Sequence, residues 1–165
     1  MQKLVIKGIV FEYESADELP LREQKLVRQA RDSALGAYTP YSGFRVGVAL
    51  MLDNGEIITG NNQENACYPS GNCAERVALF YANSRFPDSA VITMAVAAIM
   101  KDGEPTRHPV YPCGACRQVI MESEIRYGRG QRLIFTGRDK IHVVNSIRDI
   151  LPLGFDQGSL FNGRL

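Results

Sequence analysis

Four cysteines lie in two short stretches of this 165-residue chain, and their spacing could support three kinds of chemistry. Cys113 and Cys116 belong to PCGACRQVI, whereas Cys67 and Cys73 belong to NNQENACYPSGNCAERV. A C-x-x-C pair can form a redox disulfide, hold a structural metal or hold a catalytic metal, because all three use the same spacing. Other residues must therefore decide among them.

A carboxylate next to the cysteines favours the catalytic metal. Cys113 and Cys116 are three residues apart, so their sulfur atoms share one side of an opening helical turn, where free amide groups favour thiolates. Glu75 follows Cys73 by two residues, and two helical residues at that spacing point about 200° apart. Both can face one ion only if the ion lies over the N-terminus of the helix. Two helices meeting at their N-termini could then hold zinc with three thiolates and leave one position for water.

The stretches ENACYPSGNCAER and PCGACRQV resemble the zinc-dependent cytidine deaminase family, in its compact branch with three cysteine ligands. The similarity extends from PYSGF at 40–44 to LPLGF at 151–155. It implies a Zn²⁺ cofactor, deamination of cytidine and deoxycytidine to uridine and deoxyuridine in pyrimidine salvage, and a homotetramer with shared active sites. The implied zinc ligands are Cys73, Cys113 and Cys116, and the implied proton shuttle is Glu75.

The resemblance also implies a set of substrate contacts. Asn62 and Glu64 match the pair that holds the ribose hydroxyls, and the backbone of Ala74 matches the amide that meets the pyrimidine carbonyl. Phe44 resembles a wall of the base pocket. Phe155 resembles the aromatic residue that a neighbouring subunit contributes. Two segments are longer than we expect for the compact branch, namely the N-terminal segment before the first helix and the loop KDGEPTRHPVYP at 101–112.

The chemistry can also be argued from the residue types. Attack at C4 of an aminopyrimidine needs hydroxide at neutral pH, which zinc supplies by lowering the pKa of its bound water to about 7. The ring must gain a proton at N3 and the amino group must leave as ammonia, so one carboxylate, Glu75, can serve both transfers. Three thiolates leave the zinc site with an excess of one negative charge, which opposes hydroxide formation. We expect Arg76, and as a second candidate Arg117, to offset this charge by donating hydrogen bonds to ligand sulfurs.

Three other functions fit parts of the pattern. Deaminases of modified aminopyrimidine nucleosides, such as antibiotics of the blasticidin kind, share the cysteine motifs. A closed Cys₄ structural site that includes Cys67 would be a non-catalytic zinc module, although such a site needs no neighbouring acid. We expect Cys67 instead to be a small buried residue near the pocket. Polynucleotide editors fit less well, because their first ligand is usually His and this chain has Cys73.

Amino-acid composition limits the remaining classes of function. A hydrophobic content of 45% suffices for a single domain over 1–165, with a strand-like N-terminal extension at about 1–16. The formal net charge of +1 gives no basic surface for nucleic acid or an anionic membrane. The chain has no apolar run of membrane-spanning length, and its first residues lack the apolar block of a signal peptide. We therefore expect a cytoplasmic protein with a nucleoside substrate and no membrane or nucleic-acid partner.

The elements that must position these residues follow from periodicity and turn signals. We expect a hairpin over 44–60 around Asn54-Gly55 and an apolar central strand at 91–100. Further strands are expected at 4–14, 131–137 and 140–146, the last two antiparallel. Helices are expected within 19–38, over 73–84 with Val77, Ala78 and Tyr81 inward, from about 115 to 126, and briefly within 144–152. The alternation predicts a three-layer α/β/α sandwich with a mixed five-stranded sheet.

Overall fold

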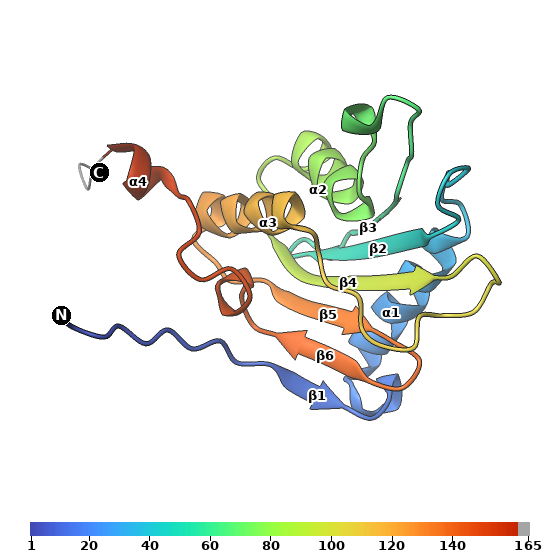
Figure 1. The fold of residues 1–165 in the computed structure, drawn as a ribbon, viewed down its shortest axis with the longest axis horizontal. Helices are drawn as coiled ribbons and strands as arrows, with labels where there is room; N and C mark the ends of the chain where they lie inside the picture. The colour runs from blue at the N-terminus through green and yellow to red at the C-terminus, as the bar shows by residue number, and fades with distance from the viewer. Residues whose placement is uncertain (162–165) are drawn as a thin grey trace.

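A computed structural model describes residues 1–161, which form one mixed sheet with helices on both faces (Figure 1). The strands are β1 (Phe11–Tyr13), β2 (Arg45–Leu52), β3 (Ile57–Asn61), β4 (Val91–Ile99), β5 (Arg132–Thr136) and β6 (Ile141–Val144). The α-helices are α1 (Leu21–Ala34), α2 (Ala74–Arg85), α3 (Gly114–Tyr127) and α4 (Gln157–Phe161). Single 3₁₀ turns are η1 (Ala16–Glu18), η2 (Tyr68–Ser70) and η3 (Ile147–Asp149).

The strand order is β1-β6-β5-β4-β2-β3, and only β4 and β5 pair in parallel within the described residues. The predicted α/β/α sandwich with a mixed sheet is confirmed, but the predicted number of five strands is wrong. The sixth strand is β1, which pairs with β6 and extends the sheet at that edge. The predicted hairpin is confirmed: β2 and β3 are antiparallel, and Gly55 at the turn has a φ of 89°, which a glycine adopts without strain.

Small and large residues alternate along β2 because its two faces meet different layers. Val48 and Leu50 pack in the core beneath α2 and α3, whereas Ala49 packs in the core beneath α1. Next to Ala49 on this side, Gly47 allows close approach: a Cβ there would lie 2.1 Å from the carbonyl oxygen of Ala30 on α1. The central strand β4 is buried on both faces, as its unbroken apolar sequence predicts.

The topology brings the N-termini of α2 and α3 together. Strand β3 runs in the same direction as β4, because both are antiparallel to β2. Helix α2 follows the C-terminal end of β3, and α3 follows that of β4 after the 101–112 loop. Both helices therefore start at the same end of the sheet, where their free amide groups can face a common centre.

Two local expectations differ from the structure. The strand expected over 4–14 is formed only at 11–13, since the four-residue strand β6 pairs with three residues of β1. Residues 1–10 have no regular secondary structure and project away from the sheet in an extended path (Figure 1). On α2, Tyr81 is 55% exposed, and the inward positions are Ala74, Ala78, Leu79 and Ala82.

No described helix has the length and apolar character needed to cross a membrane.

Candidate metal centre and adjoining cleft

Two of the predicted ligands occupy the N-cap positions of the two meeting helices. Cys73 precedes α2 and Cys113 precedes α3, and both have extended backbone angles, with ψ values of 152° and 168°. Cys116 lies in the first turn of α3 and is fully buried. All three cysteines therefore lie at the first turns of the two helices, whose free amides favour negative charge nearby.

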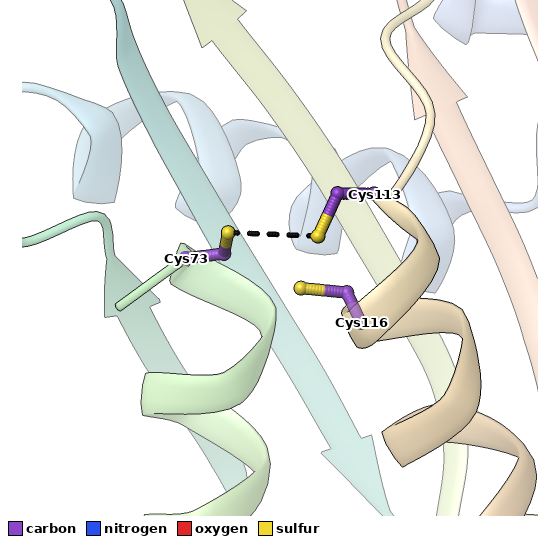
Figure 2. A group of neighbouring side chains, drawn as sticks. All are labelled: Cys73, Cys113 and Cys116. Atoms are coloured by element: carbon purple, nitrogen blue, oxygen red, sulfur yellow. Dashed lines mark hydrogen bonds between the residues drawn. The ribbon is translucent and has the colours of Figure 1, made fainter. Parts of the chain in front are cut away.

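The three sulfur atoms form a cluster that fits one metal ion (Figure 2). They lie within 4.8 Å of one another, and the Sγ atoms of Cys73 and Cys113 are 3.8 Å apart. In a tetrahedral site with zinc–sulfur bonds of about 2.3 Å, two sulfurs are about 3.8 Å apart. The spacing and the soft thiol donors both suit zinc. Cys67 is exposed and outside the cluster, so a closed Cys₄ site is not formed, and the expected burial of Cys67 is wrong.

The cluster distributes its protons unevenly in the metal-free protein. A hydrogen bond from the Cys116 thiol lowers the pKa of Cys73 to about 5, against the effect of burial and with a further contribution from Arg76. The same hydrogen bond, together with burial, raises the pKa of Cys116. The lowered pKa favours the thiolate of Cys73, which is the protonation state that a metal ligand needs.

Arg76 lies beside the cluster, as expected for a residue that balances its negative charge. One terminal nitrogen, Nη2, donates to the carbonyl oxygen of Gly71 at 3.4 Å. The Nε atom is buried and has no hydrogen-bond partner. An unpaired buried donor is costly unless an anion faces it, so this orientation fits a centre made of thiolates.

Glu75 is only 5% exposed, in the first turn of α2. Burial raises the pKa of its carboxyl above the ordinary range, and the charge at Cys73 adds to this, while a bond from its own backbone amide acts in the opposite direction. A buried carboxyl group with a raised pKa beside the cysteine cluster can both take and return a proton.

One member of the cluster, Cys73, borders a cleft of about 510 Å³, a volume typical of small-molecule sites, whereas Cys113, Cys116 and Glu75 are not among its lining residues. Cys73 and Arg76 lie in its wall, together with the predicted residues Asn62 and Glu64. The other lining residues, which sequence reasoning missed, are Tyr41, Ser42, Gln63, Asn65, Tyr68, Gly71 and Asn72.

Asn62 and Glu64 hold the loop that carries Phe44. Asn62 accepts from the backbone amide of Val46 at 2.7 Å and donates to the carbonyl of Phe44 at 3.0 Å. The Glu64 carboxylate accepts from the backbone amides of Tyr41 (2.9 Å) and Ser42 (3.2 Å) and from the Ser42 hydroxyl. The hydrogen bond from the Ser42 hydroxyl contributes most to lowering the pKa of Glu64, burial opposes it, and the two backbone amides add to the lowering. About one of its roughly four acceptor positions is left for a ligand.

The remaining predicted residues lie at different distances from this cleft. Ala74 is fully buried as the first residue of α2, and Phe44 is half-buried. Arg117 donates to two backbone carbonyls, those of Pro112 (2.9 Å) and Ile150 (2.7 Å), and to no sulfur among the described residues. Phe155 is 57% exposed between η3 and α4, outside the cleft lining, and its carbonyl accepts from Gln118 at 2.7 Å.

Comparisons with known proteins agree with this geometry. The family model described as the cytidine and deoxycytidylate deaminase zinc-binding region matches residues 21–127, which include all three clustered cysteines. A cytidine deaminase of Halalkalibacterium halodurans is 48% identical over 99 residues, covering 60% of this chain and 70% of the relative. A cytidine deaminase of Mycoplasma pneumoniae is 40% identical over 120 residues, covering 72% and 83%. The crystal structure of cytidine deaminase from Burkholderia pseudomallei superposes with a TM-score of 0.67 at 36% identity, covering 79% of this chain and 97% of that one.

Proposed function

Because the chain belongs to the cytidine and deoxycytidylate deaminase family, we propose that it hydrolyses cytidine and deoxycytidine to uridine and deoxyuridine with release of ammonia. The observation that carries the proposal is the cluster of three thiols at two helix N-termini, beside the buried carboxyl of Glu75 and a cleft that Cys73 borders. Zinc is the cofactor, since the matched family region binds zinc and the cluster fits it.

The proposed mechanism divides the work between metal and carboxylate. Cys73, Cys113 and Cys116 would hold the zinc ion, which would supply hydroxide at neutral pH. Glu75 would take the proton released from water and deliver it to N3 of the pyrimidine. It then assists proton transfer to the exocyclic amine as the C4–O bond forms and the C4–N bond breaks, so that ammonia leaves. Its burial supports this role, because a raised pKa makes the carboxylate a stronger base for taking up the proton of water.

Two further groups support the chemistry from the helix N-terminus. Arg76 offsets the excess negative charge of three thiolates, and its unpaired Nε supports this role. The backbone amide of Ala74, the first residue of α2, can meet the pyrimidine carbonyl, because helix-opening amides have no intrahelical partner.

We assign recognition of the sugar to Asn62 and Glu64, with Phe44 as a wall of the base pocket. Both polar residues line the cleft, and Glu64 keeps an acceptor position for a hydroxyl donor. The Glu64 carboxylate would repel a phosphate group, so we expect a nucleoside rather than a nucleotide as the substrate. The matched relatives are cytidine deaminases, so a blasticidin-type substrate is not favoured.

We further propose that the active site is completed by a neighbouring subunit in a homotetramer. Phe155 lies outside the cleft of its own chain and is 57% exposed. Other aromatic side chains on or near the cleft and α2 are also exposed: Tyr41, Tyr68, Phe80 and Tyr81. Exposed aromatic surface of this kind is typical of association sites, and a stacked aromatic from a second chain would close the cleft over the base.

An ultraviolet assay of cytidine loss, with and without a zinc chelator, tests the proposed function. We expect turnover of cytidine that is lost after chelation and restored by zinc. Free cytosine and cytidine monophosphate should be far poorer substrates, because one leaves the sugar-binding groups unpaired and the other adds a phosphate. Equal rates on all three compounds would contradict the assignment of Asn62 and Glu64.

A further inference from the structure

The two segments that are longer than expected, the N-terminal extension and the 101–112 loop, meet through one chain of hydrogen bonds. Glu12 of β1 bonds Nε2 of His142 on β6 at 2.9 Å, and Nδ1 of His142 bonds the hydroxyl of Tyr111 in the loop. An ionised carboxylate only accepts, so Nε2 carries the hydrogen, and in the neutral ring Nδ1 accepts from the Tyr111 hydroxyl. The side chains of Glu12, His142 and Tyr111 therefore form a directional relay.

The relay lies on the face of the sheet that supports α2 and α3. Glu12 and Phe135 are both cross-strand neighbours of His142, so these three residues form one row across β1, β6 and β5. Phe135 belongs to the core beneath α2 and α3. The ring of Tyr111 packs edge-on against Phe135, with centroids 5.2 Å apart, and lies 5.9 Å from the ring of His142. Tyr111 is thus fixed by packing at one side and by the relay at its hydroxyl.

The 101–112 loop is also fastened before and after Tyr111. The amide of Arg138, in the turn between β5 and β6, donates to the carbonyl of Thr106 at 2.8 Å. In the same turn, a Cβ on Gly137 would lie 2.6 Å from the backbone of His108, so the two segments touch. After Tyr111, the carbonyl of Pro112 accepts from Arg117 at 2.9 Å.

The position of the Cys113 sulfur depends on this loop more than the position of the Cys116 sulfur does. Cys116 is fully buried, so the core holds its side chain in place. Cys113 is exposed at the N-cap, two residues after Tyr111, and its sulfur position follows the path of the loop. A shift of Tyr111 would therefore move Cys113 relative to Cys73 and Cys116.

We propose that Glu12, His142 and Tyr111 are positioning residues through which the N-terminal strand holds Cys113 in its metal-binding geometry. The proposal rests on the zinc centre of the proposed function. The N-terminal extension would then help to retain the metal, although the residues of the extension lie outside the cleft.

Zinc release to an excess of chelator, followed with a zinc-sensitive dye on the full-length protein, tests this proposal. Tyr111→Phe keeps the ring against Phe135 and removes only the hydroxyl. We expect zinc to leave this variant about tenfold faster than the wild type, the low end of the effect of removing a group that orients a metal ligand. Glu12→Ala should accelerate release similarly, whereas Glu12→Gln, whose amide oxygen can still accept from Nε2, should restore slow release.

Glu14→Gln is the matched control, because Glu14, like Glu12, forms an ion pair with Lys140 but does not contact His142. It should release zinc within about twofold of wild type, well below the tenfold effect. The double variant Tyr111→Phe/Glu12→Ala should release zinc no faster than Tyr111→Phe alone, since both changes break one relay. If Tyr111→Phe does not fold, Glu12→Ala carries the test at an exposed position.

Release at the wild-type rate in Tyr111→Phe and Glu12→Ala, or equal acceleration in the Glu14→Gln control, would overturn the proposal. Failure of the proposed function looks different, because a zinc-loaded protein that does not deaminate cytidine would still report its rate of zinc release. The two ideas can therefore fail independently.

Discussion

Replacing Glu75 by Gln is the most direct test of how the cleft performs its chemistry. The side chain is 5% exposed, and Gln has almost the same shape, so the substitution leaves no cavity and keeps all three cysteines. Zinc content and fold should persist while turnover falls. Loss of general acid–base catalysis costs about 10²–10⁴-fold in rate, and the low end corresponds to about 2.7 kcal/mol of activation free energy.

The same substitution should change the stability of the metal-free protein in a pH-dependent way. Burial raises the pKa of the Glu75 carboxyl in the folded state, so its ionisation opposes folding above the ordinary pKa of 4.5. Glu75→Gln should therefore raise the unfolding temperature of the metal-free protein at neutral pH. This advantage should vanish below that ordinary value, where both folded and unfolded chains are protonated.

The assays are steady-state turnover of cytidine, zinc content by atomic absorption, and thermal unfolding after chelation. Glu122→Gln makes the same chemical change at an exposed position of α3 and should leave all three unchanged. A Glu75→Gln enzyme within about tenfold of wild-type turnover falls short of the range for general acid–base catalysis. That result would remove Glu75 from the mechanism.

Three further predictions follow from the site and its supports. Cys116→Ser should abolish or badly weaken zinc binding, whereas Cys67→Ser should keep one zinc per chain by atomic absorption; zinc loss from Cys67→Ser would revive the Cys₄ interpretation. Phe155→Ala should raise the KM for cytidine by the equivalent of about 1–3 kcal/mol of stacking. Mixing Phe155→Ala chains with Glu75→Gln chains should restore some activity, and no restoration would indicate that each subunit works alone. Gly60→Ala would place a Cβ 2.7 Å from the α2 backbone and should cost about 1–3 kcal/mol in denaturant unfolding; an unchanged midpoint would show that α2 can shift freely.

The cluster of ligands was predictable because its information is local. Cys113 and Cys116 are three residues apart at a helix start, and Cys73 also precedes a helix, so spacing indicated a shared centre and the family resemblance named the three as ligands. The hairpin and the buried strand β4 were predictable for the same reason, from a turn signal and an unbroken apolar run. The zinc-binding family follows from these local patterns.

Features that depend on distant partners were not predictable. The N-terminal strand is short because β6 pairs with only three of its residues, and nothing in the N-terminal sequence reports the length of β6. Tyr81 resembles an inward residue by periodicity, but small residues fill the inward face of α2 where it approaches the sheet. The contacts of Glu64 with Tyr41 and Ser42 join two loops more than twenty residues apart, so only the fold reveals them.

The places of the zinc ligands along the chain have a thermodynamic consequence. Cys73 and Cys113 are 40 positions apart, and the segment between them contains α2, β4 and the 101–112 loop. The three sulfurs come together only in the folded chain, so zinc binds the folded state and is released on unfolding. At a free zinc concentration about 100 times the Kd, such binding stabilises the folded state by about 2.7 kcal/mol, a large fraction of the total stability of a typical domain. The free energy of unfolding should therefore rise with the free zinc concentration, so that zinc supply sets the folded fraction of the protein as well as its activity.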